Sequence, residues 1–177
     1  MAKMSPQQGF FPWLDLPPDT MRAREHFWTL FRRIAFFYGF EPMRTSPFDD
    51  PRRFSALLKG DVFQGREALR AVLPNREVFI RIGGYFSLLR AYGTHHMSEW
   101  SQPVKLYQEG ERFWHEGEND EGRIENGYEA NLLIIGEETS IAEAQAIQVV
   151  WYALEDAGVD RESVGLSIQP LGCGHCF

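Results

Sequence analysis

The residues best suited to chemistry lie in one stretch, ERFWHEGENDEGRIENGYEA, at positions 111–130. Its apolar ends have the composition of two strands, and its charged centre has that of a solvated loop. The stretch is therefore either a nucleotide-binding hairpin or an ordinary surface hairpin.

A second set of candidate ligands, CGHC, lies near the end of the sequence. The thiolates of Cys173 and Cys176 have the spacing of half a tetrahedral zinc site, with His175 as a sterically awkward third ligand. No second CxxC supplies the missing ligands, so a reduced thiol pair is the simpler interpretation. A disulfide-stapled secreted protein would spread its cysteines along the chain.

The composition is that of one ordinary globular domain. The chain has 177 residues, of which 44% are hydrophobic and 24% charged, and a chain of this length can bury a core without staples. The net charge of -7 argues against general nucleic-acid binding, which needs clustered Lys and Arg. We find no apolar run that suits a membrane span and no secretory signal, so we expect a cytoplasmic protein.

The first half of the chain is predicted to begin with a helix and to continue as short extended segments. Asp19 or Thr20 can cap the helix, and Gly39 ends it. Its arginines lie mostly off the apolar stripe, so we expect them on a solvated face. Beyond the helix we expect an extended segment at 40–50, helical turns at 50–60 and 65–74, a hairpin of strands 77–82 and 85–90 around a Gly83–Gly84 turn, and a helix from Thr94.

The second half is predicted to hold a long hairpin and a second helix. The alternation of strand pairs with segregated helices predicts an α+β fold with a mainly antiparallel sheet flanked by helices. The expected elements are strands at 104–116 and 127–136, a helix capped by Ser140 and closed by Gly158 with Ile141, Ala144, Ile147, Val150, Trp151 and Leu154 along one side, and a last strand from 163.

Taken in order, these pieces resemble the catalytic core of a class II aminoacyl-tRNA synthetase of the histidyl-tRNA synthetase group. DLPPDTMRAREHF is similar to the family's opening, and YGFEPMRTSPFDD is similar to motif 1, near 39–49, with its fixed proline at Pro47. VFIRIGGYFSLLRAYGT is similar to a hairpin that ends in L-R-P-E-x-T. The stretch at 106–136 is similar to motif 2, whose usual form is F-R-x-E, a charged loop, G-R and a second strand with Gln.

The resemblance implies a reaction, a cofactor and partners. A motif 2 arginine would hold the α-phosphate of ATP, bound with Mg²⁺, while a carboxylate attacks it and pyrophosphate leaves. Such a step depends on positioning and fixed positive charge. Motif 1 would form a homodimer through Gly39–Phe48, and the motif 2 loop would reach toward tRNA.

The sequence departs from the family where a cation is needed. F-R-x-E reads F-W-H-E, so Trp114 stands at the arginine position. Loss of such a charge costs about 3–4 kcal/mol in the transition state, or roughly a hundred- to thousandfold in rate. We expect Arg112 to point to the opposite face of the strand, so that replacing the lost cation would need a bulge or a register shift. Glu116 and Arg123 match the family and are the other expected nucleotide-binding residues.

The expected amino-acid site is altered as well. L-R-P-E-x-T reads LRAYGT, in which Arg90 and Thr94 match while Tyr92 replaces the glutamate that would hold the ammonium group. Glu129 stands at the position of the motif 2 glutamine. A phenol supplies no negative charge at neutral pH.

The family's motif 3 and its anticodon-binding domain have no counterpart in these 177 residues. The chain is therefore either the front part of a longer protein or one that has given up the full reaction. The sequence predicts a histidyl-tRNA synthetase-like ligase core that is weak or inactive as it stands. The alternatives are a non-catalytic regulatory subunit, of the kind that serves ATP phosphoribosyltransferase, and an RNA-binding or dimerisation module.

Overall fold

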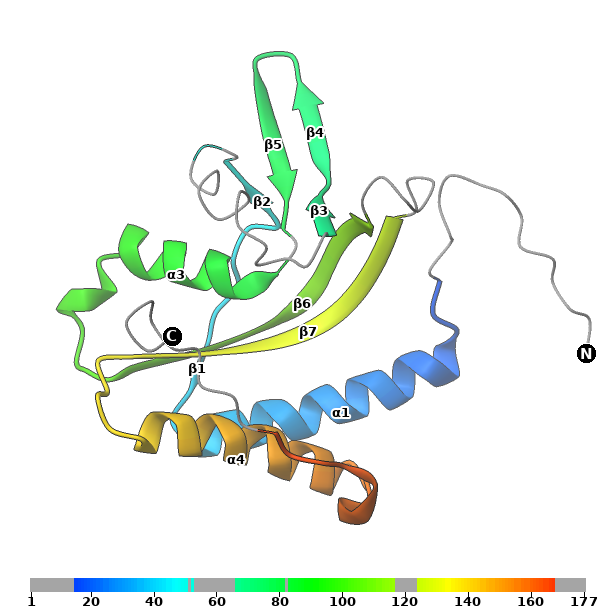
Figure 1. The fold of residues 1–177 in the computed structure, drawn as a ribbon, viewed down its shortest axis with the longest axis vertical. Coiled ribbons are helices and arrows are strands. Elements are labelled where there is room, and N and C mark those ends of the chain that lie inside the picture. Colours follow the sequence, from blue (N-terminus) through cyan, green and yellow to red (C-terminus); the bar gives the residue numbers. More distant parts are fainter. Residues whose placement is uncertain (1–14, 51, 53–65, 82, 117–123, 168–177) are drawn as a thin grey trace, which may run out of the picture.

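The structure is a computed structural model, which describes residues 15–50, 52, 66–81, 83–116 and 124–167. A long two-stranded hairpin runs through its centre, with helices on both sides (Figure 1). The helices are α1 (Pro18–Phe37), α3 (Gly84–Thr94) and α4 (Ile141–Asp156), with 3₁₀ turns η2 (Met97–Glu99) and η3 (Arg161–Ser163). The strands are β1 (Glu41–Pro42), β2 (Phe48–Asp49), β3 (Arg66–Ala68), β4 (Arg70–Leu73), β5 (Arg76–Ile80), β6 (Val104–Glu116) and β7 (Ile124–Ile135).

The strands form two small sheets. In the larger sheet, β7 pairs with β6 in antiparallel fashion from Val104↔Ile135 to His115↔Ile124. Since β7 takes one edge of β6, β1 and β3 share the other edge, β1 parallel and β3 antiparallel. The smaller sheet has the order β2-β5-β4 and is antiparallel throughout. The predicted α+β class with a mainly antiparallel sheet is confirmed.

The β6–β7 hairpin carries a separate apolar core on each face, because successive side chains of a strand point to opposite sides. On one face Tyr107 packs with Phe31 of α1 and Val149 of α4. On the other face Leu106 packs with Leu88 of α3. Figure 1 shows the same layers, with α1 and α4 together on one side and α3 on the other.

Helix α1 begins at Pro18, so both predicted caps, Asp19 and Thr20, lie inside its first turn. Its N-cap is Pro17, and no side chain caps it. Pro18 suits the first helical position because its fixed φ is already helical and its missing N–H would have no partner there. Asp19 lies in the first turn, where a carboxylate is favoured by the helix dipole. Gly39 follows the end of the helix with φ +78°, as the sequence indicates.

Between residues 65 and 94 the predicted strand at 77–82 forms as β5, but the other predictions are wrong. Residues 66–68 and 70–73 form strands instead of helical turns, because pairing with β6 and β5 outweighs the helix propensity of Glu, Ala and Leu. There is no hairpin around Gly83–Gly84. Gly83 is the N-cap of α3, whose buried Leu88 and Ala91 follow the helical period. No helix starts at Thr94, where α3 ends.

The predictions for the C-terminal half are partly confirmed. β6, β7 and α4 form as expected, and Ser140 is the N-cap of α4, although its side chain makes no capping bond. The buried residues of α4 are Val149 and Ala153, whereas Val150 is 49% exposed. Residue 163 ends the 3₁₀ turn η3 in place of starting a strand.

Candidate functional site

The candidate site is the face of the β6–β7 hairpin that lies toward α3. Gln108, Arg112 and Trp114 share this face of β6, since they are separated by even numbers of residues. Directly opposite on β7, Asn131 pairs with Gln108 and Glu129 pairs with Gly110, so their side chains lie on the same face. We call these five residues the α3 face.

Arg112 and Trp114 stack on one another on the α3 face. The guanidinium carbon of Arg112 lies 4.8 Å from the centroid of the Trp114 ring, and the indole is buried. The expectation that Arg112 points to the opposite face is wrong, because side chains two residues apart on a strand share a face. Gly127, which pairs with Arg112, has no side chain to fill this space. A Cβ there would lie 3.0 Å from Arg112 Nε and 3.3 Å from the indole.

Glu129 connects the sheet to the start of α3. One carboxylate oxygen accepts a hydrogen bond from the backbone N–H of Gly84. The other oxygen lies 4.0 Å from Nη1 of Arg112, at the long limit of an ion pair. A carboxylate at this end of a helix is also favoured by the helix dipole. Gly84 is required for this close approach, since a Cβ there would lie 2.8 Å from Asn131 Nδ2 and 2.9 Å from Gln108 Nε2.

Arg81 fills the gap that β1 and β3 leave on the outer edge of β6. Its carbonyl accepts from Phe113 N–H at 3.3 Å, and its Nε donates to the Glu111 carbonyl at 3.1 Å. Its Nη1 donates to the Thr45 hydroxyl at 3.2 Å, and that hydroxyl donates to Gln108 Oε1 at 2.7 Å. Burial lowers the pKa of Arg81 from its usual value, and the nearby carboxylates of Glu129 and Asp49 act against this shift.

The predicted amino-acid-binding residues Arg90, Tyr92 and Thr94 lie on α3 and do not end a strand. Arg90 Nε lies 2.7 Å from Oδ1 of the buried Asp49, which also accepts from the Ser87 hydroxyl at 3.0 Å. This ion pair joins β2 to α3. Tyr92 packs against the Leu88 core, and Thr94 is exposed. A binding role for the three residues stays a prediction.

The strand that precedes α3 is β5, which ends at Ile80 and is followed directly by Arg81, and α3 begins at Gly84. This arginine is not among the predicted site residues. The signal was present in the sequence as an apolar strand run that ends in Ile-Arg before two glycines. The predicted strand at 85–90 puts the strand end at Arg90 instead, whereas α3 forms there.

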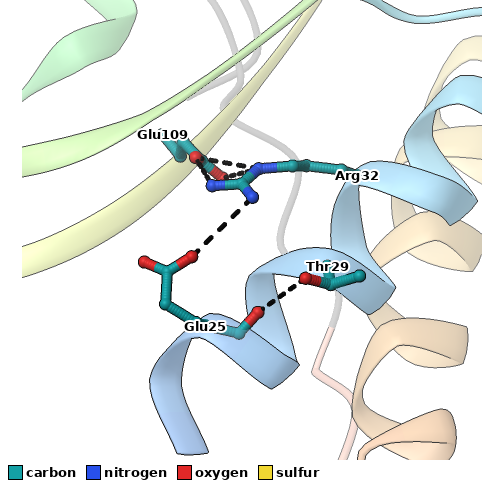
Figure 2. A network of polar contacts seen from close by, with 4 residues as sticks. All are labelled: Glu25, Thr29, Arg32 and Glu109. Atoms are coloured by element: carbon teal, nitrogen blue, oxygen red, sulfur yellow. Dashed lines mark hydrogen bonds and ion pairs between the residues drawn. The ribbon is translucent and has the colours of Figure 1, made fainter. Parts of the chain in front are cut away.

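A cleft of about 1060 Å³ opens between the N-terminal half of α1 and the outer edge of β6. Its charged side chains are largely paired. The Glu109 carboxylate accepts from Arg32 Nε at 3.0 and 3.1 Å, and Arg32 also lies 3.9 Å from Glu25 (Figure 2). The hydrogen bond to Glu109 raises the pKa of Arg32. The guanidinium of Arg24 lies 3.4 Å from the Tyr128 ring centroid. The prediction of a solvated face is wrong for Arg24, whose side chain is 19% exposed, whereas that of Arg32 is 40% exposed.

Several predicted site residues lie outside the part of the chain that the structure describes. They are the side chain of Glu116, the loop arginine Arg123, and the cysteines Cys173 and Cys176. Within the described ranges, no three His, Cys, Asp or Glu side chains gather as metal ligands would. Of the helices described, none has the length and apolar character needed to cross a membrane.

Comparison with known proteins relates the chain to one group of enzymes, although no protein-family model matches it. It is 28% identical to the histidine–tRNA ligase of Gluconobacter oxydans over 174 residues, which is 97% of this chain and 40% of that relative. It is 33% identical to the histidine–tRNA ligase of Thermus thermophilus over 92 residues, which is 52% of this chain and 22% of the relative. The chain thus spans about 40% or less of the length of these curated relatives.

Two solved structures share its fold. One is described as an ATP phosphoribosyltransferase regulatory subunit/histidyl-tRNA synthetase from Bacillus halodurans, with a TM-score of 0.73 and 12% identity over 89% of this chain and 40% of that one. The other is the apo histidyl-tRNA synthetase of S. aureus, with a TM-score of 0.63 and 18% identity over 88% of this chain and 35% of that one.

Proposed function

Because the chain has the fold of a histidyl-tRNA synthetase-like class II core, we propose that it binds a nucleotide on its α3 face and activates an amino acid weakly or not at all. The observation that carries the proposal is Trp114. The position of the phosphate-binding arginine holds a buried indole that stacks with Arg112. The bound nucleotide would be ATP with Mg²⁺.

The weak activation follows from the charge that adenylation requires. Negative charge on the α-phosphate is stabilised by a fixed cation, and an indole brings no charge and a single N–H donor. Replacement of that cation lowers the rate by roughly a hundred- to thousandfold. Trp114 cannot be a mobile surface residue that moves aside, because its side chain is 8% exposed and packs between neighbours on the sheet.

The amino-acid side of the site is also weakened. With β5 as the strand that carries L-R-P-E-x-T, the glutamate position would be Gly83, which carries no charge. The closest replacement is Glu129, with Oε2 3.8 Å from where a Cβ of Gly83 would lie. That carboxylate is already engaged by Gly84 N–H and by Arg112. An incoming ammonium group would therefore have to compete with contacts inside the protein.

A second candidate function is that of a regulatory subunit. The protein from Bacillus halodurans, whose description names an ATP phosphoribosyltransferase regulatory subunit, matches the chain with a TM-score of 0.73. A regulatory role needs ligand binding and a partner surface but no α-phosphate cation, so Trp114 is compatible with it. In this case the partner would be an ATP phosphoribosyltransferase.

Calorimetry on the full natural chain tests both candidates. We expect heat of binding with ATP and Mg²⁺, and weaker or undetectable binding of histidine. No binding of ATP at millimolar concentration would overturn the nucleotide-binding proposal. Titration with a catalytic subunit of ATP phosphoribosyltransferase separates the two functions, because only a regulatory subunit binds it with a defined stoichiometry.

The remaining properties of this proposed function concern its assembly and location. The segment Gly39–Phe48 would form the homodimer contact, and Phe48 in it is 52% exposed. The loop of residues 117–123 would approach tRNA. The protein would act in the cytoplasm, where ATP and tRNA are used.

A further inference from the structure

We infer that Arg112 holds a phosphate oxyanion on the α3 face, two residues along β6 from the position of the missing cation, with Trp114 as the platform beneath its guanidinium. This inference rests on the proposed function and names the residue that carries its anion contact. The lost arginine and Arg112 are two positions apart on β6, so both belong to the same face of the strand. A shift of two residues moves the charge along the strand by about 7 Å without a bulge.

The guanidinium of Arg112 is held in place but has unused hydrogen-bonding capacity. Its carbon lies 4.8 Å from the indole centroid, a distance typical of a cation–π contact. Its Nε is buried and has no hydrogen-bond partner among the described residues. Its ion pair with Glu129 is long, at 4.0 Å. A guanidinium has five N–H donors in a planar fork that matches phosphate oxygens.

Glycine at position 127 makes this arrangement fit. A Cβ there would lie 3.0 Å from Arg112 Nε and 3.3 Å from two atoms of the indole. Both contacts are tighter than ordinary van der Waals distances, so a side chain at this position would displace the stacked pair. Gly127 therefore gives Arg112 and Trp114 room to lie together at the strand surface.

The same face offers a further donor without an acceptor. The buried Nδ2 of Asn131 has no hydrogen-bond partner among the described residues. Glu129 lies between Arg112 and Asn131 in register. The donors without partners in the described part of the chain, Arg112 Nε and Asn131 Nδ2, need acceptors, whereas the Glu129 carboxylate already accepts from Gly84 N–H. These donors favour an anionic ligand over a cationic one. An arriving phosphate would replace the long Glu129 contact with close, charge-assisted bonds.

The test uses inorganic pyrophosphate as the probe, with the full natural chain and calorimetric titration. We expect the wild type to bind it and Arg112→Met to bind it about ten- to a hundredfold more weakly, the loss typical of one charged hydrogen-bonding partner. Arg161→Met is the matched control, since Arg161 of η3 is an exposed arginine that forms an ion pair with Glu155 of α4. It should bind within twofold of the wild type.

Two further variants examine the platform and the position of the charge. Trp114→Leu keeps the cation but removes the aromatic ring, so binding should weaken by a few fold. Trp114→Arg in the Arg112→Met background returns a cation to the same face and should restore binding. The circular dichroism spectrum and unfolding midpoint of each variant show whether it folds as the wild type does.

The outcomes separate this inference from the proposed function. Equal pyrophosphate binding by wild type and Arg112→Met, or no binding by the wild type, overturns the role of Arg112. The nucleotide-binding proposal is judged by ATP instead. If ATP binds equally to both proteins, the proposed function stands and the inference falls. If pyrophosphate binds through Arg112 but ATP does not bind, the inference stands and the nucleotide-binding proposal falls.

Discussion

Replacement of Arg81 by methionine should destabilise the fold, because Arg81 closes the outer edge of β6 between β1 and β3. Methionine keeps the length of the apolar stem but removes the hydrogen bonds to the Glu111 carbonyl and the Thr45 hydroxyl. A bond from a charged donor contributes about 1.5–3 kcal/mol when buried. Arg81 is only half-buried, and Thr45 keeps its bond to Gln108. We therefore expect Arg81→Met to lower the free energy of unfolding by about 2 kcal/mol in total.

Urea unfolding followed by circular dichroism measures this loss. Arg161→Met removes an arginine whose ion pair with Glu155 is exposed, and its unfolding midpoint should match the wild type. Gly110→Ala adds an independent check, since a Cβ there would collide with the Arg81 guanidinium and force it away from its partners. A stability change below about 0.5 kcal/mol for Arg81→Met would refute the view that this side chain replaces a missing strand.

Three further predictions concern charge, pH and assembly. Arg32→Gln should lower the unfolding midpoint at low salt and much less in about 1 M NaCl, since its pair with Glu109 is partly exposed; equal loss at both salt concentrations would contradict an ionic origin. Burial raises the pKa of Tyr107 above 10.0, so this group's stabilisation is complete below the unfolded pKa and is lost as pH rises through the folded pKa. Urea midpoints measured from about pH 9 to about pH 11 should fall, and less steeply for Tyr107→Phe; identical slopes would count against it. The wild type should be a dimer by light scattering and Phe48→Asp a monomer, because Phe48 lies in the proposed contact and is 52% exposed; a monomeric wild type at micromolar concentration would rule the contact out.

The sequence predicts well those elements whose side-chain period is long and uninterrupted. α1 and α4 follow from apolar residues three and four apart, and the β6–β7 hairpin follows from two apolar runs around a charged loop. The predicted α+β class and the resemblance to the class II core are confirmed by the solved structures. These elements determine the fold, and they also place Trp114 and Glu129 on a common face.

The segment between residues 65 and 94 was not predictable in the same way. Residues 66–73 contain good helix formers but form strands. Residues 66–68 pair with the distant β6, whereas residues 70–73 form a local hairpin with β5. The run from Tyr85 to Arg90 is too short and apolar to distinguish strand from helix by period alone. A strand predicted at 85–90 puts Arg90 at the strand end, whereas in the structure Arg81 follows the strand β5.

The side of β6 to which Arg112 points is a different case, because it could be predicted from the sequence alone. Residues 112 and 114 are two positions apart, so a regular strand places them on one face without any structural knowledge. What the sequence could not show is the space that Gly127 leaves beside them, since that depends on the register of β7.

The most direct test of the central claim is amino-acid-dependent exchange between ATP and pyrophosphate, measured on the full natural chain with histidine. With an indole at position 114, we predict an exchange rate at or near the background without amino acid. Exchange at the rate of an ordinary synthetase would contradict the account, because the reaction would then proceed without the cation on which it is held to depend.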